Sequence, residues 1–256
     1  MKKVFSIIMS GFLVSCAHNI QDPEIQNVQY LKGANFFYCI DSESPIMELS
    51  WDYPVKPGME EWKQFQSNKE MTDACQIPVN ILSSLSTKEL TAICLQYPLL
   101  TDMFAFNTPD QGIDAFFNDF NGIRELYKRN EVSKELLSWY NCQIRNCSLL
   151  KEKNFSDVEK GRFMGSISAL EYLLSRVTDN YMDILKNLVA GYETKLKYPN
   201  YFCAGLDHNL FARAHIIDNM CKQCFDDIPE KGHLFAPIYL KETVDIINKL
   251  SYQLIK

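Results

Sequence analysis

The sequence lacks the motifs of the common enzyme classes. It contains no HExxH zinc motif, no GxSxG nucleophile elbow, no Walker loop, no GxGxxG turn after a predicted strand and no EF-hand loop. These absences exclude the familiar zinc proteases, α/β-hydrolases, P-loop NTPases and dinucleotide enzymes at the level of motifs. They leave room for an enzyme with an unfamiliar site.

The chain also lacks an excess of basic residues. Lysine and arginine total 26 against 32 aspartates and glutamates, a formal net charge of −6. Without residues 1–15, which carry two lysines, the balance becomes 24 − 32 = −8. Nucleic-acid binding needs a basic face, and electrostatic docking on anionic lipid needs basic clusters. The charge therefore argues against both.

The N-terminal apolar run is too short to cross a membrane. It extends from Val4 to Val14, about 11 residues against the roughly 20 that span a hydrocarbon core. The basic start Met1-Lys2-Lys3 and the small residues that follow the run are typical of a secretory signal. We therefore expect residues 1–15 to be a signal peptide.

Cys16 follows this signal directly, and Leu13 lies three positions before it. The stretch LVSC resembles the lipobox of bacterial lipoproteins, in which the cysteine thiol is acylated by groups such as palmitate and becomes the mature N-terminus. The resemblance predicts lipidation at Cys16 and attachment to the membrane through that lipid. The alternative interpretations are a plain signal peptide with an incidental cysteine and a buried N-terminal helix.

Eight further cysteines follow Cys16. They are Cys39, Cys75, Cys94, Cys142, Cys147, Cys203, Cys221 and Cys224. An even number in an exported protein suggests disulfides, although the chain is much longer than the small scaffolds that depend on them. Cys142 and Cys147 flank a predicted loop and are the best candidate disulfide, because loops can supply the Cα separation that a bridge requires.

Three segments organise the chain. Residues 1–15 are the predicted signal, residues 16–50 a polar tether and irregular segment, and residues 51–256 a helical domain with a candidate sub-boundary near residues 141–154. The helical domain opens with the rigid turn YPVKPG, because each proline restricts its own φ and the residue before it.

Helix signals recur from Met59 to the end of the chain. Ser86 with Glu89, and Ser156 with Glu159, have the spacing of a capping box. Apolar residues at three-and-four spacing follow each start. The clearest stripes are Phe163, Ile167, Leu170, Leu174 and Val177, then Tyr181, Leu185, Leu188, Tyr192 and Leu196. No segment alternates as a strand would, and no fixed repeat is found. We predict an all-α fold, either an irregular helical bundle or stacked helical hairpins.

The pair Cys221 and Cys224 could signify a redox couple or half of a zinc site. Residues 206–226 are predicted to form one helix, and both thiols continue its apolar stripe. A redox CxxC pair sits at a helix N-terminus, whereas this pair lies near a C-terminal end. Buried core thiols are therefore the favoured interpretation, ahead of a disulfide and of a metal or redox role.

His208 and His215 lie two helical turns apart on one face. That spacing separates them by about 10 Å, too far for shared ligation of one ion, and places them opposite the cysteine pair. We expect surface or hydrogen-bonded histidines. The polar group in DFNGIREL is interpreted as a turn and helix-capping arrangement. No catalytic, cofactor-binding or metal-binding residue is assigned.

Several segments resemble a family of exported, uncharacterised α-helical lipoproteins of Bacteroidetes-type bacteria. They are YPVKPGMEEWKQF, ACQIP, LSTKELTAICLQYPLLTDMFAFN and DFNGIRELYKR, mainly within residues 51–140. The resemblance implies a helical envelope protein and brings no activity with it. Surface-displayed lipoproteins of such bacteria carry an acidic cluster after the lipidated cysteine. The neutral residues 17–21 depart from that pattern and favour an anchor that faces the periplasm.

These observations lead to one functional hypothesis and one alternative. The hypothesis is a lipid-anchored binding or scaffold module of the cell envelope, placed at the outer membrane facing the periplasm. Its partner would be a protein or a glycan and not a nucleic acid. The alternative is an envelope hydrolase or thiol-dependent enzyme with an unfamiliar site.

Overall fold

The computed structural model describes residues 49–152, 156–202, 205–225, 239 and 241–256. Every regular element in these ranges is a helix and none is a strand, which confirms the predicted all-α fold. The predicted signal peptide, Cys16 and nearly all of the tether lie outside the described residues.

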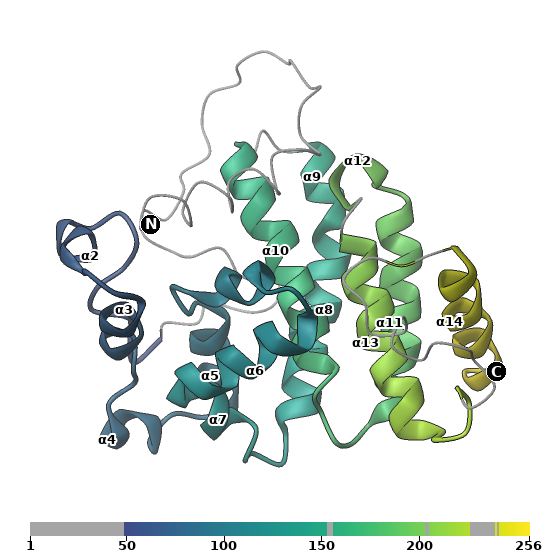
Figure 1. Cartoon of the computed structure of the whole chain (residues 1–256), viewed down its shortest axis with the longest axis horizontal. Coiled ribbons are helices and arrows are strands. Elements are labelled where there is room, and N and C mark those ends of the chain that lie inside the picture. The colour runs from purple at the N-terminus through teal and green to yellow at the C-terminus, as the bar shows by residue number, and fades with distance from the viewer. Residues whose placement is uncertain (1–48, 153–155, 203–204, 226–238, 240) are drawn as a thin grey trace.

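The N-terminal half is built of short helices, and the C-terminal half of long helices joined by short ones (Figure 1). The first group is α2 Glu60–Gln64, α3 Asn68–Ala74, α4 Val79–Leu82, α5 Thr87–Leu95, the 3-10 helix η1 Leu100–Ala105, α6 Pro109–Asp119 and α7 Asn121–Leu126. The second is α8 Val132–Arg145, η2 Asn146–Ser148, α9 Leu149–Glu152, α10 Asp157–Leu174, α11 Tyr181–Leu196, α12 Pro199–Phe202, α13 Gly205–Met220 and α14 Lys241–Leu254.

Four long helices form a bundle at the centre of the molecule. Helix α10 packs against α8 and α13, and α11 packs against α8 and α13. Helix α14 covers the outer side of α11 and α13, at the far end of the molecule from α2 (Figure 1). No helix in the described ranges has both the length and the apolar character that a membrane crossing requires.

The short helices pack onto the bundle through α5 and α6. Helix α5 contacts α7 and α8, whereas α6 contacts η1, α7 and α10. One hydrophobic core extends from Tyr53 to Ile247 and includes residues from both halves. The candidate sub-boundary near residues 141–154 is helical through Glu152. The described halves are therefore packed around a single continuous core.

The helix starts follow the capping signals of the sequence. Ser86 and Ser156 each accept a hydrogen bond from the backbone of a glutamate three residues later, and that glutamate caps in return. Thr108 caps α6, with Pro109 at its first position. Because an N-cap contributes about 1 kcal/mol, these starts are determined locally.

The turn before the first helix is also as predicted. In YPVKPG the amide of Met59 donates to the carbonyl oxygen of Lys56, which closes a turn. Gly58 has φ of 99°, a left-handed conformation that glycine adopts without a steric penalty. The chain then enters α2.

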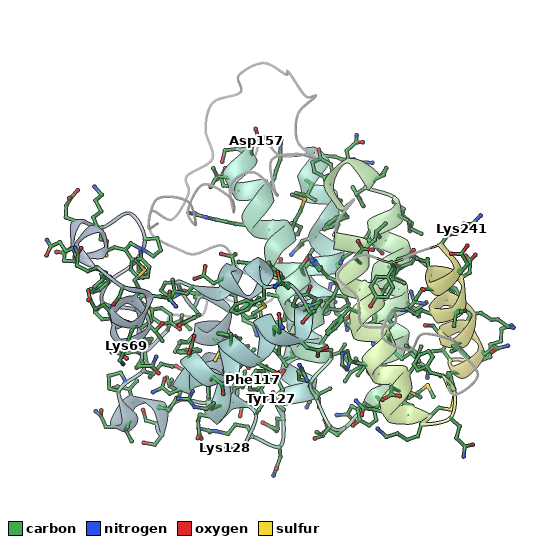
Figure 2. The ribbon with its side chains drawn as sticks, in the orientation of Figure 1. Lys69, Phe117, Tyr127, Lys128, Asp157 and Lys241 are labelled. Carbon is green, nitrogen blue, oxygen red and sulfur yellow. A yellow bond between two sulfur atoms is a disulfide. The ribbon has the colours of Figure 1, made fainter. Side chains whose placement is uncertain are left out.

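Tyr127 joins the short helices to the bundle. Its ring packs edge-on against Phe117, with 4.7 Å between centroids, and both side chains are visible in Figure 2. Its hydroxyl donates a hydrogen bond to the carbonyl oxygen of Leu173 near the end of α10. A single aromatic side chain thus links α6, the end of α7 and α10.

Candidate functional site

A buried polar cluster lies at the centre of the four-helix bundle. Each long helix contributes one residue to it: Tyr140 from α8, Glu171 from α10, Lys195 from α11 and Asn209 from α13. All four side chains have no solvent exposure. Burial of charged groups costs free energy unless they are paired and hydrogen-bonded, so their contacts decide the role of the cluster.

Lys195 is fully paired inside this cluster. Its ammonium donates to both carboxylate oxygens of Glu171, at 2.6 and 2.5 Å, and to the carbonyl oxygen of Gly205 at 2.9 Å. Tyr140 and Asn209 donate to the same Glu171 oxygen, Oε1, at 3.0 and 2.8 Å. The three N–H bonds of the ammonium therefore all have acceptors.

The apolar stripe predicted for α11 did not include Lys195, which is buried. Spacing from Tyr192 predicted Leu196 in the core, but Leu196 is 51% exposed and Lys195 occupies the buried position. Positions 185, 188, 192 and 195 also follow three-and-four spacing. A lysine at the last of these faces the core because Glu171, 24 residues earlier, supplies its counter-charge. Local periodicity cannot reveal that partner.

The protonation of the groups in and near this cluster indicates a structural role and not nucleophilic catalysis. Burial lowers the pKa of the Lys195 ammonium, and the Glu171 carboxylate opposes that shift. The nearby Cys147 thiol has its pKa raised to about 12 by burial, and it donates to the Gln143 carbonyl oxygen. A thiol with such a pKa is protonated at neutral pH and is a poor nucleophile.

The candidate disulfide between Cys142 and Cys147 is wrong. Cys142 is disulfide-bonded, but Cys147 is a free thiol buried in the core. The predicted loop between them does not exist, because α8 continues to Arg145 and η2 follows at once. The four residues between the two cysteines have helical backbone in place of the open loop that the prediction required.

The preference for core thiols at Cys221 and Cys224 is also wrong. The two residues form a disulfide, with 5.3 Å between their Cα atoms. Helix α13 ends at Met220, earlier than the predicted residue 226, so the pair lies in the turn after the helix. The stripe that suggested buried thiols stops where the helix stops.

A second polar cluster, on the surface, joins α6 to the residue after the end of α10 and to α13. The Arg176 guanidinium, just after α10, contacts the carboxylates of Asp110 at 2.7 Å and Asp114 at 3.1 Å. His215 Nε2 lies 3.4 Å from the same Asp110 oxygen. We call Asp110, Asp114, Arg176 and His215 the α6 surface cluster. All four side chains are partly exposed.

Charges within the α6 surface cluster control its protonation. The hydrogen bond with His215 lowers the pKa of Asp110, the imidazole and Arg176 charges lower it further, and partial burial opposes them. Asp110 is therefore ionised at neutral pH. An ionised carboxylate and a guanidinium, both partly open to solvent, can hydrogen-bond a polar ligand.

Aromatic rings extend from this cluster along α13. His208 lies between Phe104 and Tyr172, with centroids 5.2 and 4.9 Å away, and His215 contacts the Phe211 ring at 4.4 Å. Both histidines thus belong to one face of α13, as their spacing predicted. Burial lowers the pKa of His208 to about 3, and the Lys195 charge acts in the same direction. His208 is neutral in the folded protein.

His208 predicts a specific pH dependence of stability. Its pKa is about 3 when folded and 6.5 in an unperturbed chain, so its contribution is complete above pH 6.5 and is lost as the pH falls toward 3. Urea unfolding at pH 7 and pH 5 should show wild type losing about 2 kcal/mol more than His208→Phe. Asp207, whose pKa burial raises to about 6, titrates in both proteins and cancels in the comparison. Equal losses in the two proteins would contradict the assignment.

The polar group in DFNGIREL is structural, although Asn121 does not form the predicted turn. Asn121 begins α7, and its side-chain amide makes two hydrogen bonds with the backbone of Ile77. Arg124 donates to the carbonyl oxygens of Phe117 and Asn118 at the end of α6. Asn121 thus fixes the segment before α4 to the start of α7, and Arg124 caps the C-terminal end of α6.

Arg213 fastens the last helix to the bundle. It is fully buried, donates from Nε to the Ser251 hydroxyl at 2.9 Å, and lies over the Tyr192 ring at 5.1 Å. Burial lowers its pKa to about 10, so the guanidinium remains charged at neutral pH. Arg213 lies three residues after Leu210 and four before Ile217, so helical spacing places it on their face, but its partners Ser251 and Tyr192 come from other helices.

Within the described ranges, no three histidine, cysteine, aspartate or glutamate side chains are grouped so that they could hold a metal ion. No protein-family model, curated protein or solved structure matches the chain.

Proposed function

We propose that the chain is a lipid-anchored binding or scaffold module of the cell envelope, attached through Cys16 and facing the periplasm from the outer membrane. The observation that carries the proposal is the LVSC stretch after a short signal-like segment. The disulfide of Cys221 with Cys224 supports it, because disulfides form and persist in oxidising compartments outside the cytosol. The resemblance to exported helical lipoproteins points the same way.

We prefer a binding role to a thiol-dependent enzyme because the described free thiols are buried and protonated. Cys75, Cys94 and Cys147 are buried, and burial raises the pKa of each. Lys195 has all its donors engaged in the buried cluster. The observation that favours the hydrolase alternative is the contact of His215 with Asp110, since a histidine oriented by a carboxylate can act as a general base.

The α6 surface cluster is the candidate contact site for a partner. It carries two carboxylates, a guanidinium and an imidazole, and side chains that donate and accept hydrogen bonds in this way suit the polar surface of a protein or a glycan. Aromatic rings adjoin it along α13. The partner would meet a face to which α6, α10 and α13 all contribute.

Metabolic labelling with a fatty acid tests the anchor. Wild type is expected to incorporate label and to fractionate with membranes, whereas Cys16→Ala is expected to lose the label because the acylated sulfur is absent. Cys147→Ala is the matched control, since it also removes a thiol but leaves Cys16. An unlabelled wild type, or undiminished label on Cys16→Ala, would refute lipidation.

Cross-linking of cell envelopes, followed by detergent extraction and affinity capture of the chain, tests the binding role. Wild type should retain one reproducible protein or glycan partner, and reversal of a charge in the α6 surface cluster by Asp114→Lys should reduce its recovery. Lys69→Glu, at an exposed position remote in sequence, is the control. A partner recovered equally with Asp114→Lys would place the contact elsewhere, and no partner at all would argue against a binding module.

A further inference from the structure

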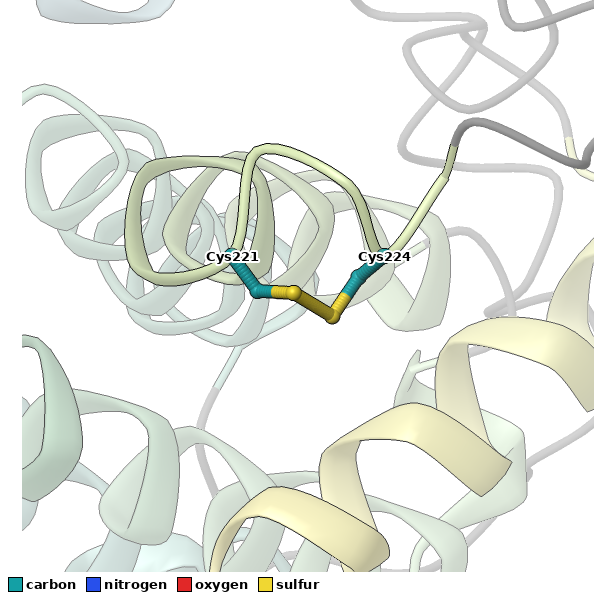
Figure 3. The surroundings of a disulfide bond; sticks show 2 residues. All are labelled: Cys221 and Cys224. Carbon is teal, nitrogen blue, oxygen red and sulfur yellow. A yellow bond between two sulfur atoms is a disulfide. The ribbon is translucent and has the colours of Figure 1, made fainter.

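The turn after α13 carries a disulfide that is open to solvent. Cys221 and Cys224 are both partly exposed, and Lys222 and Gln223 between them are exposed. Figure 3 shows the disulfide at the end of the helix, bridging the turn that follows it. A reagent or protein from solvent can therefore approach this bond without prior unfolding of the core.

The other described cysteines are shielded. Cys75, Cys94, Cys142 and Cys147 are each at most 2% exposed. Thiol–disulfide exchange requires a thiolate to reach one sulfur directly, so access decides which disulfide reacts. Among the cysteines that the structure describes, Cys221 and Cys224 are the ones that are partly exposed.

The two sulfurs of the disulfide differ in their surroundings. Cys224 packs against the hydrophobic core and precedes Phe225, which is 1% exposed. Cys221 continues the last turn of α13, and its amide donates to the carbonyl oxygen of Ile217 at 2.8 Å. Because the Cys224 side chain packs against the core, an incoming thiolate is expected to attack Sγ of Cys221.

We propose that Cys221 and Cys224 form a thiol–disulfide exchange site that accepts two electrons from a dithiol oxidoreductase. A thiolate of the donor attacks Sγ of Cys221, the bond between the two sulfurs breaks, and Cys224 leaves as a thiolate that takes up a proton. The second donor thiol then attacks the mixed disulfide and releases Cys221 as a thiol. The donor ends as a disulfide, and both cysteines of this chain end reduced.

The position of the pair makes it the substrate of this exchange and not its catalyst. The C-terminal end of a helix carries partial negative charge, which disfavours a thiolate there. Catalytic CxxC pairs lie at helix N-termini, where the opposite charge lowers the thiol pKa. Reduction would open the short ring that ties Phe225 to the end of α13, so the redox state would govern how firmly this turn is held.

Alkylation of the full chain under native conditions tests the site. After mild dithiothreitol treatment, iodoacetamide followed by mass spectrometry should label Cys221 and Cys224, while Cys75, Cys94 and Cys147 stay unlabelled until denaturant is added. Labelling of the pair only after unfolding would overturn the proposal. So would labelling of the three buried thiols at the same rate, since exchange would then require global opening.

Two single variants test the order of attack. Cys224→Ser leaves the Cys221 thiol free, and Cys221→Ser leaves the Cys224 thiol free. With 5,5′-dithiobis(2-nitrobenzoate), Cys224→Ser should react at least tenfold faster than Cys221→Ser, because the Cys224 side chain packs against the hydrophobic core. Equal rates or the reverse order would contradict attack at Cys221. Circular dichroism of both variants ensures that only folded protein is compared.

Discussion

Replacing Lys195 by methionine is expected to lower the free energy of unfolding by about 3–5 kcal/mol. The substitution removes the ammonium from Glu171 and leaves a carboxylate without its counter-charge in a site that has no solvent exposure. Urea unfolding followed by circular dichroism would measure the change. The loss is large because an unpaired buried charge is more costly than the pair itself.

The double variant Lys195→Met with Glu171→Gln separates the cost of the orphaned charge from that of lost packing. The glutamine keeps an oxygen that can accept from Tyr140 and Asn209, so the double variant is expected to be more stable than Lys195→Met alone. A double variant as unstable as the sum of the single ones would show that the two residues do not act as a pair.

An exposed ion pair supplies the matched control for Lys195. Lys69, labelled in Figure 2, belongs to α3. It pairs with Asp73, and its side chain is 81% exposed. Lys69→Met is expected to leave stability unchanged within error, because solvent screens such pairs. If Lys195→Met were no more destabilising than Lys69→Met, the buried cluster would not contribute as the contacts indicate.

Replacing Gly191 of α11 by alanine is expected to lower the free energy of unfolding by about 3 kcal/mol, the upper end of the usual cost of overpacking. A Cβ atom there would lie 1.9 Å from the Tyr140 hydroxyl oxygen and 2.7 Å from Cζ of the same ring. Tyr140 cannot retreat freely, since its hydroxyl donates to Glu171. The clash would therefore disturb the buried cluster. Urea unfolding measures the effect.

Gly165 in α10 provides the control for this substitution. A Cβ atom at position 165 would meet nothing within 4 Å. Gly165→Ala is expected to be neutral or to stabilise by up to about 1 kcal/mol, the difference in helix propensity. Equal stability of Gly191→Ala and Gly165→Ala would refute the close approach of α8 and α11.

The candidate site was only partly predictable from the sequence. The two histidines were correctly placed on one face of α13 because helical periodicity is a local property. Their surroundings were not, since the partner of His215 is Asp110, over 100 positions earlier in the chain. The sequence did not indicate a role for Arg176 either, because its two acidic partners lie on α6.

Local interactions determine where several helices of this protein begin and which face they bury, although not where α8 and α13 end. The capping boxes at Ser86 and Ser156 and the stripe through α10 involve residues three or four positions apart, so their spacing is visible in the sequence. The signal-like start and LVSC are local patterns of the same kind, and they remain the basis for the expected anchor.

Tertiary structure alone decided which polar and sulfur atoms meet. It placed Lys195 inside and Leu196 outside, because the counter-charge of Glu171 comes from another helix. It also left Cys147 as a free, buried thiol, whereas Cys142 is disulfide-bonded. Which polar side chains are buried and which thiols are bonded depends on contacts between segments far apart in the chain. The periodicity of a single helix therefore cannot predict it.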